Sequence, residues 1–244
     1  MKTVLVAGAA GGVGEGIVRA LLAAGDVNVI AVSRKSERLG ALRTNLDATT
    51  LERLVPLVGD ASDFGGALAL AEAAWNPGAV DAAVAVLGRG FWSSGPLLAL
   101  PPGEWTAVLN EMLTSHFAFA RAVVPRLAAR PASLFLSIGG GAAFEPMPDA
   151  GLMSIAAAGQ AMLTRVLARE FQTFGVTIRE LVVNGALRTR QSRAFAEPGW
   201  MTADDVGSVV AELVRTGATT WPNTRVRGPL VVMEQRSGSA LPAP

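Results

Sequence analysis

Short apolar runs alternate along the whole 244-residue chain with longer segments in which apolar residues recur every three or four positions. The continuous runs are typical of strands that are buried on both faces, and the periodic segments are typical of amphipathic helices. The expected strands are 3–8 (TVLVAG), 27–33 (VNVIAVS), 54–60 (LVPLVGD), 81–88 (DAAVAVLG), 132–141 (ASLFLSIGGG), 176–183 (VTIRELVV) and 229–233 (PLVVM). We therefore predict one α/β domain with a doubly wound, mainly parallel sheet of about seven strands and helices on both faces.

The expected helices begin and end at residues that favour helix termini. They cover 14–25, a polar segment from about Ser36, an Ala/Leu segment between the third and fourth strands, about Pro102 to Ala129, 151–171, and a segment from Thr202. The least regular stretch runs from Thr189 to Met201. Ligands of such sheets bind beyond the carboxyl ends of the strands, so this stretch is either a lid over a ligand site or a plain surface loop.

Composition excludes several classes of function. Half of the residues are hydrophobic and 17% are charged, which is enough for a buried core, and a net charge of +1 attracts neither nucleic acid nor an anionic membrane. The absence of cysteine excludes disulfides, thiolate metal sites and cysteine nucleophiles, and a single histidine, His116, cannot form a metal cluster. No metal site is expected.

The first residues do not resemble a secretory signal. Lys2 precedes an apolar run, but glycines interrupt that run, and Glu15 and Arg19 then follow on a helical face. No continuous apolar run approaches the ~18 residues that a membrane span requires. We expect a cytoplasmic protein with no membrane partner.

A glycine-rich segment joins the first expected strand to the first expected helix. In AGAAGGVG, Gly8, Gly12 and Gly14 are spaced G-x-x-x-G-x-G, with Val13 between the last two. Glycine permits a tight turn and lets backbone N–H groups approach a pyrophosphate, which then faces the positive end of the helix. This context favours a dinucleotide site, and the alternative is a glycine-rich turn without a ligand.

Together with this segment, several later ones resemble the short-chain dehydrogenase/reductase family over essentially the whole chain. The family has a Rossmann fold, uses NAD(H) or NADP(H), and begins with T-G-x-x-x-G-x-G, in which Ala7 here replaces the threonine. The further matching segments are VGD with Asp60, LGRG with Gly88, Glu104–Trp105, LARE at 167–170 and TADDV at 202–206. The resemblance implies that Asp60 meets the adenine amino group and that Gly88 belongs to the family's N-N-A-G motif.

The second strand ends in AVSRK, which bears on cofactor choice. An acidic residue here would bind the ribose 2′-hydroxyl of NAD, whereas this chain has Ser33 followed by Arg34. A guanidinium suits the bidentate recognition of a 2′-phosphate, so NADP(H) is favoured over NAD(H). The alternative is an exposed arginine at a solvated helix start, beside Lys35 and Arg38.

The resemblance also implies a catalytic set of Asn, Ser, Tyr and Lys, with Y-x-x-x-K on the helix at 151–171. Counting back from Glu170 by the family spacing places the tyrosine at Met153 and the lysine at Ala157. The chain contains no tyrosine, and its lysines are Lys2 and Lys35 alone. No change of alignment restores this pair.

The other catalytic positions differ as well. The serine position falls at Gly140, and the nearest hydroxyl, that of Ser137, lies three residues earlier. The asparagine position falls at Met112, while Asn110 is turned to another helix face. After the sixth strand, in VVNGALRTR, the family's proline is absent.

Substitute groups are few. His116 follows Met112 by four residues, titrates in the useful range and is either a proton carrier or a packed core histidine. His116 and Ser137 are therefore the two catalytic candidates. Arg89 and Arg188 either bind an anionic ligand or are solvated loop residues. Met112 and Met153 form either an adaptable apolar pocket or the filling of a closed site.

These patterns leave several functions open. The favoured one is a non-catalytic protein that binds NADP(H), weakly or vestigially, or binds a small molecule or a protein partner. The alternatives are a non-redox enzyme (a cyclase, isomerase or lyase) and a reductase with an atypical proton source. The helices at Pro102–Ala129 and Ala150–Phe174 are apolar beyond what one face needs, which predicts a homodimer, a homotetramer or a mixed oligomer with an active relative.

Overall fold

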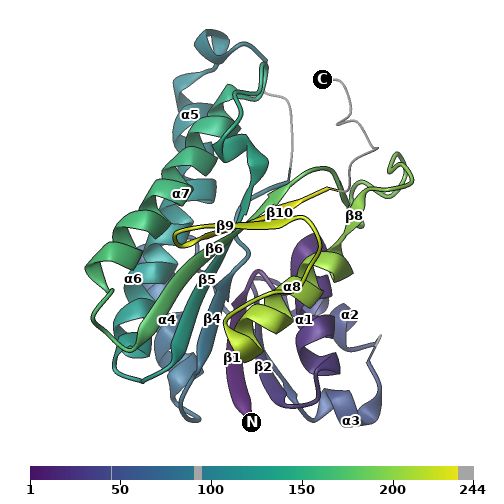
Figure 1. Ribbon diagram of the computed structural model, residues 1–244, viewed down its shortest axis with the longest axis vertical. Helices are drawn as coiled ribbons and strands as arrows, with labels where there is room; N and C mark the ends of the chain where they lie inside the picture. The colour runs from purple at the N-terminus through teal and green to yellow at the C-terminus, as the bar shows by residue number, and fades with distance from the viewer. Residues whose placement is uncertain (45, 91–94, 236–244) are drawn as a thin grey trace.

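The computed structural model describes residues 1–44, 46–90 and 95–235, which are built around one central sheet (Figure 1). Its eight strands have the order β3-β2-β1-β4-β5-β6-β10-β9, and neighbours pair in parallel except β9, which is antiparallel to β10. The strands are β1 Lys2–Ala7, β2 Val27–Ser33, β3 Leu54–Val58, β4 Ala82–Ala85, β5 Ser133–Gly140, β6 Val176–Asn184, β9 Thr224–Arg227 and β10 Leu230–Glu234. The predicted doubly wound, mainly parallel sheet is confirmed.

Of the eight strands in this sheet, the sequence did not predict β9, which lies at the edge. Its residues, TRVR, are mostly polar, and its apolar member Val226 is 61% exposed. β9 pairs with β10 alone and is exposed to solvent, so it does not need the continuous apolar residues of a buried strand. The apolar run that identifies the other strands is therefore missing from β9.

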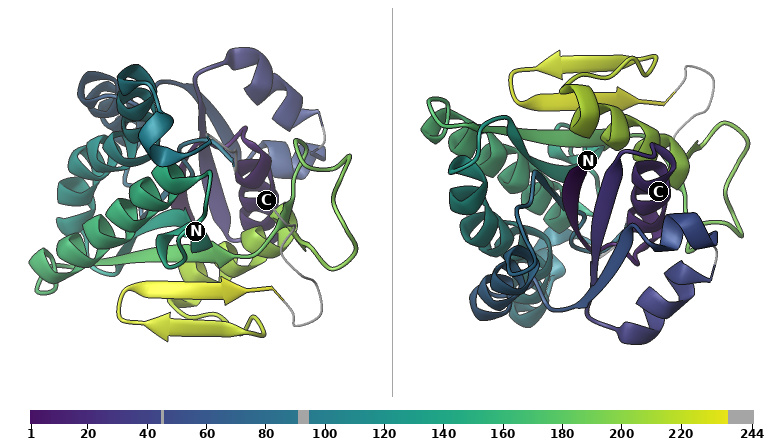
Figure 2. Two further views of the ribbon diagram at one scale, coloured as in Figure 1. Left: turned by 90° about the horizontal axis from the view of Figure 1, so that it is seen from above. Right: turned by 90° about the horizontal axis from the view of Figure 1, so that it is seen from below.

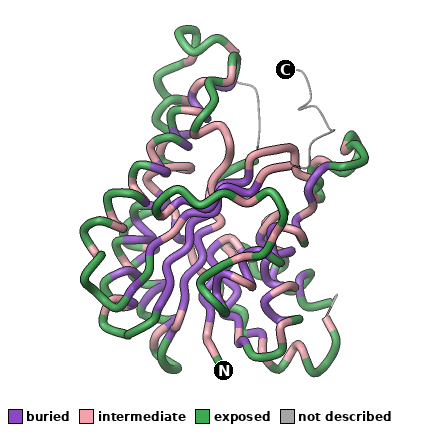
Figure 3. Tube along the Cα trace, viewed as in Figure 1, coloured by how far each residue is buried: buried purple, intermediate pink, exposed green. Residues whose placement is uncertain are grey.

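Helices cover both faces of the sheet (Figure 2). On one face α1, α2 and α8 share a core with the sheet, and on the other α4 and α6 share a second core, with α7 packed beside it. The buried strands run through the centre between these layers (Figure 3). The helices are α1 Gly12–Ala23, α2 Ser36–Arg43, α3 Ala48–Leu51, α4 Phe64–Trp75, α5 Pro102–Leu109, α6 Ser115–Ala128, α7 Gly151–Glu170 and α8 Ala203–Thr216.

The segment expected as one regular helix from Pro102 to Ala129 is interrupted. Residues Asn110–Thr114 form a π-helical turn between α5 and α6. Such a turn inserts one extra residue and often accompanies a functional site. Apolar periodicity does not reveal it, because both flanking helices keep the α-helical period.

The helices α1 and α8 cross with their backbones in contact. A Cβ atom at Gly16 would lie 2.2 Å from the carbonyl oxygen of Ala203, and one at Gly207 would lie 2.3 Å from that of Gly16. Glycine at both positions therefore lets the two helices approach more closely than side chains would allow. Immediately before α8, the short strand β8 (Met201–Thr202) pairs with β7 (Leu187–Arg188), which follows β6.

Among the described residues, α7 is long and apolar enough, with a mean hydropathy of 1.3, to cross a membrane by length and composition. The sequence contains no continuous apolar run of that length. The mean hydropathy of α7 is high because its leucine, isoleucine, valine, methionine and alanine residues outweigh Gln160 and Arg165. Core helices of α/β domains meet the same criterion, and one face of α7 is buried against the sheet.

Candidate dinucleotide site

The carboxyl ends of β1 and β4 lie side by side at the point where the sheet reverses its winding. The chain leaves β1 into α1 on one face and leaves β4 toward α5 and α6 on the other. Open α/β sheets bind their ligands at such a switch point. The glycine-rich segment of residues 7–14 therefore lies where the topology alone would place a cofactor.

The glycine turn is held against both neighbouring strands. Gly8 has a φ of +84°, and a Cβ there would lie 2.0 Å from the carbonyl oxygen of Val86, which follows β4. On the other side, Ala9 N–H donates to the carbonyl of Val32 in β2 at 3.0 Å. A Cβ at Gly14 would lie 2.1 Å from the carbonyl oxygen of Gly8, so the turn packs directly on the first turn of α1.

The first turn of α1 presents backbone donors. Its N-cap is Gly11, which has no side chain to accept from the N–H groups of Val13 and Gly14. The helix macrodipole adds a positive potential at this end. An anionic group such as a pyrophosphate would satisfy both the donors and the potential.

The residues expected at the adenosine end follow β2 and β3, which adjoin β1. Ser33 ends β2 and its hydroxyl accepts from Lys35 N–H at 3.3 Å, while the Arg34 side chain is exposed. Asp60 lies two residues after β3 and accepts from Ser62 N–H at 2.9 Å. The structure thus brings Gly8, Ser33 with Arg34, and Asp60 to one edge of the sheet.

Beyond β4, the loop that carries Gly88 rests on α6. His116 is fully buried, and its Nε2 lies 3.2 Å from the carbonyl oxygen of Leu87. Burial lowers the pKa of His116 to about 4, against the opposing effect of the Leu87 hydrogen bond. His116 is therefore neutral near pH 7, and its Nε2 donates to the Leu87 carbonyl and anchors the loop. On the same side, a Cβ at Gly88 would lie 3.4 Å from the Met112 side chain.

The face of α7 that points to the sheet carries no titratable group near its start. Met153 and Ala157 are 7% and 6% exposed. The strand end opposite is glycine at three successive positions, and a Cβ at the middle one, Gly140, would meet nothing within 4 Å. The position of the family's serine is thus sterically open.

The glycines on either side of Gly140 make room for polar side chains of β6. A Cβ at Gly139 would lie 2.0 Å from Glu180 Oε1, and one at Gly141 would lie 2.0 Å from Asn184 Oδ1. The side chains of β6 therefore occupy the space that side chains of β5 would otherwise fill.

Glu180 belongs to a buried polar cluster that the sequence reasoning missed. Gln160 Nε2 donates to Glu180 Oε1 at 3.2 Å and to the carbonyl of Ile138 at 3.1 Å. Deeper in the cluster, Ser137 Oγ and Thr164 Oγ1 lie 3.2 Å apart. The signal was the glutamate inside the apolar run VTIRELVV, because a charge there must be buried with polar partners.

Burial raises the pKa of Glu180 from 4.5 to about 7, against the opposing effects of Thr164 and Gln160. Glu180 is fully buried, and its Oε2 has no hydrogen-bond partner among the described residues. The protonated form therefore accounts for a large share of the molecules near pH 7.

The arginines expected as anion ligands differ in their surroundings. Arg89 Nε donates to Glu111 Oε2 at 2.6 Å, so its charge is balanced by the π-helical turn. Arg188 is exposed on β7. Of the two catalytic candidates, Ser137 is 2% exposed and bonded to Thr164, and His116 is equally buried, so both side chains have packing roles in this structure.

A family model described as short chain dehydrogenase matches residues 2–198. The chain belongs to the short-chain dehydrogenase/reductase family. Among the relatives of this chain is 2,3-dihydroxy-2,3-dihydro-p-cumate dehydrogenase of Pseudomonas putida, 30% identical over 178 residues, which are 72% of this chain and 68% of that protein.

Several solved structures share the fold. ElxO with NADP bound has a TM-score of 0.82 at 18% identity, with 96% of this chain and 97% of that chain covered. An NADPH-bound short-chain oxidoreductase of Pseudomonas aeruginosa PAO1, described as containing an atypical catalytic center, has a TM-score of 0.81 at 20% identity, with 98% and 97% covered. At these identities the likeness establishes the fold alone.

The two lysines of the chain lie away from α7. Lys2 begins β1, and its Nζ donates to the carbonyl of Val214 at 2.6 Å, at the amino edge of the sheet. Lys35 is the N-cap of α2, at the adenosine end. With no tyrosine in the sequence, α7 presents no tyrosine or lysine to the sheet.

We predict that replacing Glu180 by glutamine changes how stability depends on pH. The folded chain holds the Glu180 proton up to about pH 7 and the unfolded chain only to about 4.5, so native stability falls as pH rises through this window. The shift corresponds to about 3 kcal/mol. In urea unfolding, the free energy of Glu180→Gln minus that of the native protein should rise by about this amount from pH 4.5 to 8.

The unfolding free energies of the two proteins are compared by subtraction because His116 affects both in the same way. The stabilisation from neutral His116 is lost in both proteins as pH falls from 6.5 to about 4, so it cancels in the difference. Glu37→Gln, at an exposed position of α2, serves as the control and should leave the difference constant. A constant difference for Glu180→Gln as well would show that Glu180 titrates normally in the folded protein.

Proposed function

We propose that this protein binds NADP(H) at the carboxyl edge of the sheet and does not reduce carbonyl groups by the tyrosine–lysine mechanism of its family. The observation that carries the proposal is the contrast between the two ends of the site. The phosphate and adenosine end keeps its glycine turn and a free arginine at the 2′-phosphate position. The chemical end has Met153 and Ala157 where the family has its acid and its ribose ligand.

The typical sizes of the missing contributions to rate and to binding support cofactor binding without efficient turnover. A positioned general acid typically contributes ~10²–10⁴ in rate. Hydrogen bonds to a charged group contribute about 1.5–3 kcal/mol each, so the missing lysine weakens the hold on the nicotinamide ribose. The adenosine half, with Arg34 and Asp60, is independent of α7 and supports a dinucleotide of reduced affinity. We place such a binding protein in the cytoplasm.

The second candidate function is an enzyme with substitute residues, either a non-redox cyclase, isomerase or lyase, or a reductase with an atypical proton source. The open position at Gly140 and the nearby carboxamide of Asn184 favour this reading, since both adjoin the strand ends. The likeness to the Pseudomonas aeruginosa oxidoreductase with an atypical catalytic center is consistent with either function.

The test of the proposed function is NADPH binding compared with NADPH consumption in the presence of a broad set of ketones, aldehydes and enones. We expect saturable binding, and turnover at least about 10²-fold below the ordinary range of about 1–10³ s⁻¹, because the general acid is missing. Turnover within that range would show that this is an active reductase.

We predict that NADPH binds more tightly than NADH and that Arg34 is responsible. Replacing Arg34 by alanine removes a charge-assisted hydrogen bond to the 2′-phosphate, which should weaken NADPH binding about tenfold and leave NADH unchanged. Calorimetric titration of both cofactors measures this. Arg38→Ala, an exposed arginine on the same helix start, is the matched control, and equal losses in the two variants would indicate general attraction of anions.

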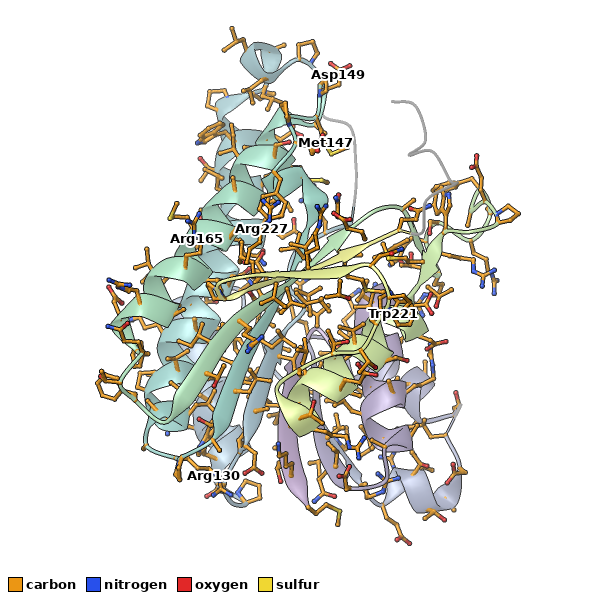
Figure 4. The ribbon with its side chains drawn as sticks, viewed as in Figure 1. Arg130, Met147, Asp149, Arg165, Trp221 and Arg227 are labelled. Carbon is orange, nitrogen blue, oxygen red and sulfur yellow. The ribbon has the colours of Figure 1, made fainter. Side chains whose placement is uncertain are left out.

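We also propose that the protein is a homodimer or homotetramer built on α6 and α7, or assembles in the same way with an active relative. The outer face of α7 leaves Ile155, Met162 and Val166 between 40% and 53% exposed, and Phe117 of α6 is 42% exposed. An exposed apolar stripe on a surface helix is typical of an interface. Arg165 of α7, labelled in Figure 4, is exposed and lies three residues after Met162 and one before Val166.

We predict that Met162→Glu separates the subunits, because it would bury a charge in the apolar stripe. Light scattering at micromolar concentration should change from a dimer or tetramer mass to a monomer mass. Val55→Glu introduces the same charge at a position of similar exposure on β3 and should leave the mass unchanged. A native protein that is already monomeric would contradict the proposal.

A further inference from the structure

The segment between β7 and β8, residues 189–200, lies against the first turn of α1. A Cβ placed on Gly12 would be 2.6 Å from Gln191 Oε1 and 3.0 Å from Thr189 Cβ. In dinucleotide folds, glycine at such a position leaves space for the pyrophosphate to approach the backbone. In this chain the side chains of Gln191 and Thr189 fill that space.

An ion pair fastens the segment to α1. Arg190 Nη1 lies 3.1 Å from Glu15 Oε1, one turn into the helix that carries the phosphate donors. Within the segment, Ser192 Oγ accepts from Thr189 N–H at 2.9 Å and donates to the carbonyl of Leu187 at 2.6 Å. These bonds shape residues 189–192 into a compact turn that sets the Gln191 carboxamide over Gly12.

The ends of the segment are anchored more firmly than its middle. Pairing of β7 with β8 holds Leu187 and Met201 together, and the capping box of Thr202 and Asp205 fixes the start of α8. Between these anchors, Arg193 and Phe195 are exposed to solvent. Opening of the segment therefore requires loss of few buried contacts, and the ion pair is its main tie to α1.

We propose that this segment is an autoinhibitory latch: the Gln191 carboxamide occupies the pyrophosphate position, and the Arg190–Glu15 ion pair must open before a dinucleotide binds. The inference rests on the proposed NADP(H)-binding function and concerns its regulation. The latch lowers the affinity for any ligand with a pyrophosphate, because the binding-competent form is only part of the population. It leaves the adenosine end untouched.

Two variants open the latch without altering the net charge. Gln191→Ala removes the carboxamide, and the double variant Glu15→Gln/Arg190→Gln removes the ion pair. Each should lower the dissociation constant for NADPH about two- to fivefold, the range expected of an exposed ion pair. Neither should change the affinity for adenosine 2′-monophosphate, which reaches the adenosine end and has no pyrophosphate.

The matched control is Arg19→Gln/Asp204→Asn, which removes another exposed ion pair of α1, at 2.6 Å, that does not involve the segment. It should leave both affinities at the native values. A second readout needs no cofactor: trypsin should cleave after Arg193 faster in both latch variants than in the native and control proteins, with unfolding midpoints measured alongside.

The outcomes separate the latch from the proposed function. NADPH binding by the native protein without improvement in the variants overturns the latch and leaves the function intact. Binding of NADPH by the variants alone supports the latch. If neither native protein nor variants bind NADPH or adenosine 2′-monophosphate, both the function and the latch are overturned.

Discussion

The backbone contact between α1 and α8 is the constraint on which the cofactor end depends. Gly16 and Gly207 let the two helices touch, and a side chain at either position would collide with a backbone carbonyl. This contact fixes the start of α8, and with it β8, beside the first turn of α1. The segment that follows β6 must then pass over the glycine turn on its way to α8, so the proximity of Gln191 to Gly12 follows from a helix crossing elsewhere.

Contacts between neighbouring elements also shape the site around the end of β5 and the start of α7. Gly139 and Gly141 contribute no side chains to the site, but Glu180 and Asn184 of β6 occupy the space beside them. Of the three glycines, Gly140 alone faces open space.

Features whose signal lies within a single segment of the chain could be predicted from the sequence. Seven strands, the glycine turn and the start of α7 follow from apolar runs and local turn chemistry, which each segment carries in itself. The edge strand β9 and the π-helical turn at Asn110–Thr114 were not predictable in this way, because the first gains its stability from one neighbour and the second keeps the apolar period on both sides. The Glu180 cluster and the contact of Gln191 with Gly12 join residues far apart in the chain, and a single sequence does not specify which of them meet.

The two edge strands of the sheet, β3 and β9, differ in sequence, but each opposes pairing with a strand of another molecule. The outer edge of β3 contains Pro56, which has no N–H to offer a further strand, and β9 carries Arg225 and Arg227 on either side of Val226. A proline at one edge and charged side chains at the other, Arg225 paired with Glu234 and Arg227 exposed, oppose the addition of a strand from another molecule. Growth of the sheet into an aggregate is thus disfavoured at both ends, and association of copies is left to the helical faces.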